Sequence, residues 1–167
     1  MRYLALVLIV IFSSCKSYIY VVRHAEKATP MGNNSDVPLT ATGEQRAQAL
    51  EATLQNKKIG AVYSTNTIRT KSTAKPTADH FRLPVLIYGN PPDSVFIASL
   101  KRSNKNTLVV GHSNTVDDIV NMLCEKKLIE TDLKDTEYNN LFVVKRSGKK
   151  FTLIRKHYGI STATPKL

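Results

Sequence analysis

Two arginines and two histidines in this sequence are well suited to chemistry on a phosphate group: Arg23, His24, Arg69 and His112. Arginine presents a planar fork of N–H donors that matches the oxygens of a phosphate. Histidine can attack as a nucleophile or, when charged, donate a hydrogen bond. Each of the four lies shortly after an apolar run typical of a buried strand. We therefore expect a pocket that binds anions and contains an imidazole.

The rest of the chain predicts the elements that must position this pocket. Strands are expected at residues 18–22, 59–63, 84–88 and 107–110, which are rich in β-branched and aromatic side chains. Helices are expected at residues 40–57, 67–80, 93–102 and 114–127. Thr42 and Gln45 could form a capping box at the start of the first helix. Two alternating strands, at residues 140–146 and 150–156, flank Ser147-Gly148 and predict a hairpin.

Strands that alternate with helices imply a mostly parallel sheet covered on both faces. The predicted fold class is α/β, a three-layer α/β/α arrangement with a mostly parallel central sheet and a C-terminal β-hairpin at one edge. Such sheets bind ligands at the carboxyl ends of their strands. Arg23-His24, Arg69 and His112 follow three of these ends, and the helices that come next add N–H donors and partial positive charge.

Four motifs follow one another along most of the chain. They are Arg23-His24-Ala25-Glu26, LTATGEQ at residues 39–45, residues 63–74 around Arg69, and VVGHSNT at residues 109–115. In this order and spacing they resemble the signatures of the histidine phosphatase superfamily, in its phosphoglycerate mutase-like and phosphohistidine phosphatase-like branch. The family has Arg-His-Gly-Glu where this chain has Ala25. The resemblance implies a phosphatase, a phosphoric monoester hydrolase that needs neither metal nor cofactor.

The same resemblance implies a role for each matching residue. His24 would attack phosphorus and become phosphohistidine, which water then hydrolyses. The residues expected to bind the phosphate oxygens are Arg23, Arg69, His112 and Asn114. Helix capping is an equal alternative for Asn114, and also for Ser64 and Thr65.

The proton donor for the leaving group is the least well marked part of the site. One branch of the family has an acid directly after the second histidine, where this chain has Ser113. The other branch takes it from the loop after the third strand, and Asp93 is the nearest carboxylate there. We expect Asp93 to be the catalytic acid, with capping of the next helix as the alternative. Other candidates are Asp36, Glu26 and Asp117.

The N-terminus predicts export. Residues 1–15 read MRYLALVLIVIFSSC, a basic start, a ten-residue apolar run at 3–12 and small residues before Cys15. The run is too short to span a bilayer and fits a secretory signal. Phe12-Ser13-Ser14-Cys15 resembles a bacterial lipobox, which implies lipid attachment to Cys15 on the periplasmic or outer-membrane face. A buried strand at 4–12 is the alternative. One domain is expected at residues 18–160, followed by a tail at 161–167.

Charge and composition indicate which classes of partner the chain can bind. Lys plus Arg number 24 against 13 Asp plus Glu, a formal net charge of +11. A basic protein attracts anionic substrates and surfaces. We expect a small phosphorylated substrate, a membrane reached through the lipid, and no nucleic acid, because the basic clusters are not interleaved with aromatic residues. A lipoprotein that binds phosphorylated ligands without turnover is the alternative function. The sequence leaves the oligomeric state open.

Overall fold

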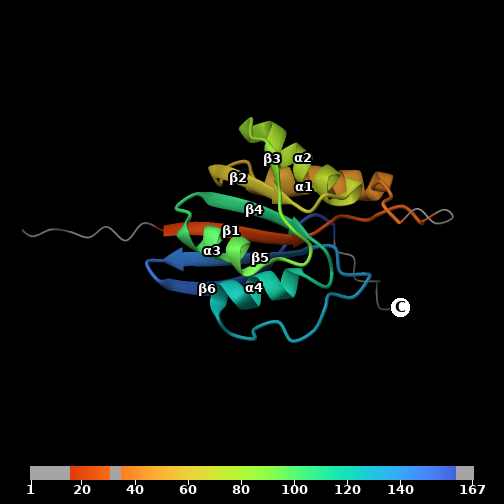
Figure 1. The fold of residues 1–167 in the computed structure, drawn as a ribbon. Coiled ribbons are helices and arrows are strands. Elements are labelled where there is room, and N and C mark those ends of the chain that lie inside the picture. The colour runs from red at the N-terminus through yellow and green to blue at the C-terminus, as the bar shows by residue number, and fades with distance from the viewer. Residues whose placement is uncertain (1–15, 31–34, 161–167) are drawn as a thin grey trace, which may run out of the picture.

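The fold is a six-stranded sheet between two layers of helices. A computed structural model describes residues 16–30 and 35–160 (Figure 1). The strands, in chain order, are β1 (Lys16–Arg23), β2 (Ile59–Ser64), β3 (Val85–Ile87), β4 (Asn106–Gly111), β5 (Asn140–Ser147) and β6 (Lys150–His157). The helices are α1 (Ala41–Leu54), α2 (Ile68–Phe81), α3 (Ser94–Arg102) and α4 (Val116–Cys124).

The sheet is mostly parallel, with the strand order β3-β2-β4-β1-β5-β6. β1, β2, β3 and β4 run parallel, and β5 pairs antiparallel with β1 and with β6. The C-terminal hairpin therefore extends one edge, as the sequence predicts. Because β1 and β4 are neighbours, Arg23 lies opposite Gly111, so the first and second histidine motifs begin side by side.

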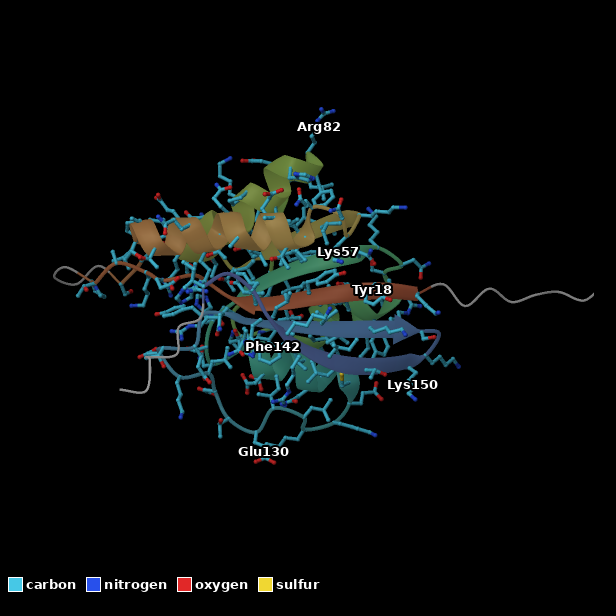
Figure 2. All side chains as sticks on the ribbon, turned by 180° about the vertical axis from the view of Figure 1, so that it is seen from behind. Tyr18, Lys57, Arg82, Glu130, Phe142 and Lys150 are labelled. Carbon is cyan, nitrogen blue, oxygen red and sulfur yellow. The ribbon has the colours of Figure 1, made fainter. Side chains whose placement is uncertain are left out.

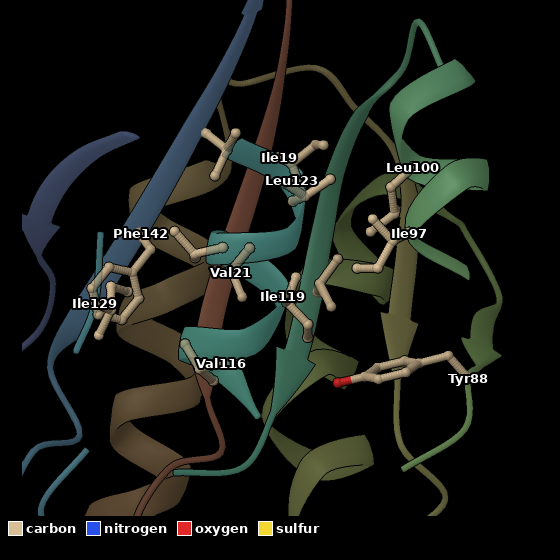
Figure 3. Packing of buried hydrophobic residues seen from close by; sticks show 13 residues of the cluster. Ile19, Val21, Tyr88, Ile97, Leu100, Val116, Ile119, Leu123, Ile129 and Phe142 are labelled. Atoms are coloured by element: carbon tan, nitrogen blue, oxygen red, sulfur yellow. The ribbon is translucent and has the colours of Figure 1, made fainter. Parts of the chain in front are cut away.

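The side chains of the strands alternate between two cores, one on each face. On one face, α3 and α4 pack against Ile19, Val21 and Val109 (Figure 3). On the other, α1 and α2 pack against Tyr20, Val22 and other strand residues. This arrangement confirms the three-layer prediction. Among the described residues, the members of these clusters lie between Ile19 and Tyr158, so a chain that begins at Lys16 keeps all of them.

Two helix caps differ from those that the sequence suggested, at α1 and at α4. Thr40, not a Thr42–Gln45 capping box, caps α1 by accepting from the Gly43 N–H. α4 begins after Thr115 rather than after Ser113 or Asn114, and its cap forms no side-chain hydrogen bond to the helix. The reason is a tight turn after β4, in which the Thr115 hydroxyl accepts from the His112 N–H instead.

The predictions for the two ends of the chain remain open. The signal at 1–15, Cys15 and the tail at 161–167 lie outside the described residues. Within residues 16–30 and 35–160, none of the helices has the length and apolar character needed to cross a bilayer.

Candidate active site

The four predicted residues meet at the carboxyl ends of three neighbouring strands. The His24 N–H, just after β1, donates to the Gly111 carbonyl at the end of β4, 2.9 Å away. This bond holds the two histidine motifs together, and the imidazole rings lie edge to face with centroids 5.6 Å apart. Arg69, in the first turn of α2, reaches His112 from the side of β2, at 3.5 Å from Nη2 to Nδ1.

His24 is held in the state that a nucleophile needs. Its Nδ1 lies 2.7 Å from the Ala25 carbonyl oxygen, which can only accept, so Nδ1 carries the proton and Nε2 keeps its lone pair. The side chain is buried, and this desolvation lowers its pKa to about 3. The hydrogen bond to Ala25 opposes that shift, and the charges of Arg23 and Arg69 add to it. The imidazole is therefore neutral at ordinary pH.

His112 is fixed at both nitrogens. Its Nδ1 faces the Arg69 guanidinium, a group that only donates, so Nδ1 is the acceptor and Nε2 carries the proton. Nε2 donates to the Thr65 hydroxyl at 2.9 Å, and that oxygen lies 3.0 Å from the Thr70 hydroxyl. Burial, followed by the charges of Arg69 and Arg23, lowers the pKa of His112 to about 4. A hydroxyl chain thus supports the second histidine.

Thr65 therefore has a role that sequence reasoning missed. The alternatives were a helix cap or direct phosphate contact. The cap of α2 is Thr67 instead, which accepts from the Thr70 N–H. Thr65 is buried and orients His112. The capping prediction for Ser64 also fails, since its hydroxyl donates to the Thr65 carbonyl.

Arg69 is tied to the loop before α1. Its Nη1 donates to the Ser35 carbonyl at 3.3 Å and lies 3.6 Å from Asp36 Oδ1. The same Asp36 oxygen accepts from the Ile68 N–H at 2.8 Å. Nε of Arg69 has no hydrogen-bond partner among the described residues, although it is buried. A phosphate oxygen would supply an acceptor of the kind that such a donor lacks.

Arg23 is held by the segment between α4 and β5. Its Nη1 donates to the Lys134 carbonyl at 2.7 Å, and its Nη2 donates to Asp135 at 2.9 Å. The guanidinium carbon lies 4.4 Å from the centroid of the Tyr138 ring, which is 6.2 Å from the His24 ring. Sequence reasoning missed this segment, and the one signal in it was a lone aromatic residue among charged neighbours. Like Arg69, Arg23 has a buried Nε without a partner among the described residues.

The structure places the candidate acids in different surroundings. Asp93 is exposed and caps α3, where its Oδ1 accepts from the Phe96 N–H at 2.7 Å. This confirms the capping alternative, while its catalytic role stays a prediction. Glu26 forms a bidentate ion pair with Arg46. Asp117 is buried in the first turn of α4, and burial raises the pKa of its carboxyl.

Asn114 is the last of the residues that the sequence predicts to bind phosphate. Asn114 is exposed in the turn after β4 and does not cap α4. Its contact with phosphate stays a prediction. Over residues 16–30 and 35–160, His, Cys, Asp and Glu side chains form no cluster of three placed to hold a metal ion.

Comparison with known proteins agrees with this geometry. The family model of the histidine phosphatase superfamily (branch 1) matches residues 19–89, a segment that contains Arg23, His24 and Arg69 and ends before His112. No curated protein sequence matches the chain.

Solved structures share the fold at low sequence identity. The protein histidine phosphatase SixA, solved with tungstate, is 21% identical, with a TM-score of 0.67 over 84% of this chain and 96% of that one. The alpha-ribazole phosphatase of Shigella flexneri is 16% identical, with a TM-score of 0.62 over 82% and 94% of the two chains. A mycobacterial glucosyl-3-phosphoglycerate phosphatase is 10% identical, with a TM-score of 0.60 over 89% and 100%.

Proposed function

We propose that this chain, whose residues 19–89 match the family model of the histidine phosphatase superfamily (branch 1), hydrolyses phosphomonoesters through a covalent phosphohistidine on His24. One observation carries the proposal. The Ala25 carbonyl fixes the proton of His24 on Nδ1, so a neutral imidazole presents the Nε2 lone pair beside two arginines and a second histidine.

In the first step, Nε2 of His24 attacks phosphorus and forms a P–N bond. The bond from phosphorus to the ester oxygen breaks, and the leaving oxygen takes its electron pair and a proton. Arg23 and Arg69 stabilise the negative charge on the transferring phosphoryl group through donors that are already in place. Without a ligand, Nδ1 of His112 is an acceptor beside Arg69. We propose that it donates a hydrogen bond to the same oxygens after it takes a proton from the bound phosphate monoanion.

In the second step, water attacks phosphorus and the P–N bond breaks. The electron pair returns to Nε2, the water gives up a proton, and inorganic phosphate leaves. The hydrogen bond from Nδ1 to the Ala25 carbonyl persists through both steps. That bond stabilises the positive charge that the ring carries while Nε2 is bonded to phosphorus.

The proton for the leaving group requires an acid, and we keep Asp93 as the sequence-based choice. Its carboxylate would have to leave the Phe96 N–H to act. Asp117 is the second choice, because the raised pKa of its carboxyl favours proton donation near neutral pH. Comparing Asp93→Asn with Asp117→Asn on substrates with good and poor leaving groups distinguishes them, since only loss of the true acid selectively slows the poor ones.

The site is proposed to act on small phosphorylated molecules. Names of structurally similar proteins cover a protein histidine phosphatase, an alpha-ribazole phosphatase and a glucosyl-3-phosphoglycerate phosphatase. The substrates that these names imply share only the phosphoryl group. We further propose that the chain is exported and anchored by lipid on Cys15, because residues 12–15 resemble a lipobox.

The decisive experiment measures hydrolysis of p-nitrophenyl phosphate by residues 16–167 with a chelator present. His24→Ala is expected to abolish turnover, and His157→Ala, an exposed histidine of β6, to leave it intact. Quenched wild-type protein should carry acid-labile phosphate on His24. Turnover without that phosphohistidine, or turnover lost on chelation, would refute the mechanism.

A ligand-binding lipoprotein without turnover is the second candidate. It is favoured by the engagement of Glu26 with Arg46 and of Asp93 with the start of α3. Calorimetry with phosphate esters distinguishes the two functions. Binding without hydrolysis from acid to neutral pH would favour this candidate, whereas slow hydrolysis abolished by His24→Ala would exclude it.

A further inference from the structure

Basic residues gather at the end of the sheet opposite the candidate active site. This end, here called the basic pole, contains the start of β1, the end of α3, the segments that precede β2 and β4, the residues that directly follow α4, and the end of β5 with the turn to β6. Its basic residues are Lys16, Lys57, Lys58, Lys101, Arg102, Lys105, Lys126, Lys127, Arg146, Lys149 and Lys150. Within these segments the acidic residue is Glu125, and Lys101 already neutralises it at 2.6 Å.

Hydrogen bonds join these segments into one surface. Arg146 of β5 donates to the Ser103 carbonyl at 2.7 Å and to Asn104 Oδ1 at 2.8 Å. Asn106 at the start of β4 donates to the Lys57 carbonyl at 2.7 Å, and its Oδ1 accepts from the Tyr18 N–H of β1 at 2.9 Å. Figure 2 shows Tyr18, Lys57 and Lys150 at the same end of the molecule.

Acidic residues gather at the other end. The segments after the carboxyl ends of β1, β3 and β4, and the segment before β5, contain Glu26, Asp36, Asp93, Asp117, Asp118, Glu130, Asp132, Asp135 and Glu137. Fewer basic residues lie at this end: Lys27 and Lys134 fall within these segments, and Arg23 and Arg69 beside them belong to the candidate active site. The charges of the described residues are therefore distributed unevenly along the strands, from a positive pole to an acidic rim around the candidate active site.

A groove at the basic pole combines positive charge with apolar surface. It has a volume of about 640 Å³ and lies between the end of α4 and the start of β6. Its apolar lining includes Leu123, Leu128, Phe151 and Leu153. Its basic lining is Lys126, Lys149, Lys150 and Arg155. Apolar side chains beneath lysines suit the boundary between lipid headgroups and acyl chains, and they contribute nothing to a nucleic-acid backbone contact.

We propose that the basic pole is a membrane-facing surface that binds anionic phospholipid headgroups and holds the catalytic edge away from the bilayer. Charge complementarity identifies the occupant, since clustered lysines beside a membrane bind anionic headgroups. The position of the start of β1 on this surface supports the proposal. Lys16, the first residue of β1, follows Cys15 directly in the sequence, so a lipid on Cys15 would attach at this pole.

The test uses residues 16–167, which keep every residue of the described hydrophobic clusters and lack Cys15, so that binding reports the protein surface and not the lipid. Co-sedimentation compares vesicles of phosphatidylcholine with vesicles of equal parts phosphatidylcholine and phosphatidylglycerol. The pole variant is Lys57→Gln/Lys149→Gln/Lys150→Gln. The control variant, Lys71→Gln/Lys75→Gln/Lys156→Gln, removes the same charge from α2 and from β6.

Wild-type protein should bind the anionic vesicles and not the neutral ones, with binding that weakens as salt rises. The pole variant should lose about tenfold or more in affinity, and the control variant less than about threefold. Hydrolysis of p-nitrophenyl phosphate should be equal in all three proteins, which checks folding. Equal losses in both variants, equal binding to neutral vesicles, or tighter binding to duplex DNA than to anionic vesicles would overturn the proposal.

Discussion

Gly43 packs directly against the backbone carbonyl of Glu26, so closely that a Cβ on Gly43 would overlap that oxygen. The same carbonyl accepts from the Thr40 N–H at 2.9 Å. The first turn of α1 is therefore built against the residue two positions after the nucleophile. This contact explains why a glycine stands in the LTATG motif.

Gly43→Ala should cost about 3 kcal/mol of unfolding free energy, because backbone and not a flexible side chain would have to move. Gly60→Ala is the matched control. There the new Cβ would lie 3.3 Å from the flexible side chain of Lys105, so the cost should stay below about 1 kcal/mol. Urea unfolding of residues 16–167 measures both. Similar costs for the two variants would contradict this account of Gly43.

Replacing Arg46 alone should lower the free energy of unfolding more than replacing Glu26 and Arg46 together. Their side chains are 17% and 4% exposed, and Nε and Nη2 of Arg46 both reach the carboxylate. Arg46→Met leaves a largely buried carboxylate unpaired and should cost about 3–5 kcal/mol. The double variant Glu26→Gln/Arg46→Met should recover part of that loss in urea unfolding. A double variant less stable than Arg46→Met would contradict the prediction.

Thr65 should affect kcat indirectly, because its hydroxyl orients the His112 ring. Thr65→Val removes the acceptor of the Nε2 proton, and an unpaired buried donor costs about 1–3 kcal/mol. We expect kcat for p-nitrophenyl phosphate to fall about tenfold or more with little change in KM. Thr65→Ser, which keeps the hydroxyl, should restore most of kcat. An unchanged kcat in Thr65→Val would remove this positioning role.

Tyr138 should matter more to substrate binding than Asp135 does, although both contact Arg23. The Asp135 side chain is 95% exposed, so Asp135→Asn should raise KM by less than about threefold. Tyr138→Ala removes a ring that lies 4.4 Å from the guanidinium and should raise KM about five- to thirty-fold. Tyr138→Phe, which keeps the ring, is the control. The opposite ranking of Asp135→Asn and Tyr138→Ala would contradict this prediction.

Stability should fall as the pH falls below the ordinary histidine value of 6.5. Burial lowers the pKa of His24 to about 3 and that of His112 to about 4. Between 6.5 and these values, unfolded chains bind protons that the native histidines do not, so acid favours unfolding. Each histidine should contribute up to about 1.4 kcal/mol per pH unit in that window. Urea unfolding at pH 7, 6 and 5 measures the slope, which His112→Asn should reduce. An unchanged slope in His112→Asn would contradict this assignment.

The sequence predicts the fold and the centre of the site because both depend on local patterns. The strands are β-branched runs, and each ends within a residue or two of its predicted end. Parallel pairing then brings Arg23, His24 and His112 to one edge, which requires only that their strands be neighbours. Arg69 joins these residues because α2 begins four residues after the end of β2, which places Arg69 within reach of His112.

The supports of the site were not predictable in the same way. Lys134 and Tyr138 reach Arg23 from a segment without periodicity, so no pattern indicated where it folds back. Thr65 orients His112 across strands, a contact that depends on the order of β2 and β4 and not on local sequence. Asp93 was ambiguous from the start, because one carboxylate at a loop–helix junction suits both capping and proton donation.

If the chain is attached to a membrane through Cys15, β1 sets the distance between the membrane and the nucleophile. The strand has eight residues, with the attachment point before its first residue and the nucleophile after its last. At about 3.3 Å per residue the strand is roughly 26 Å long. The nucleophile of an anchored molecule would then stand that far above the lipid phosphates. Such a height favours phosphomonoesters that are dissolved or that protrude from the membrane over those that lie at the level of the lipid headgroups.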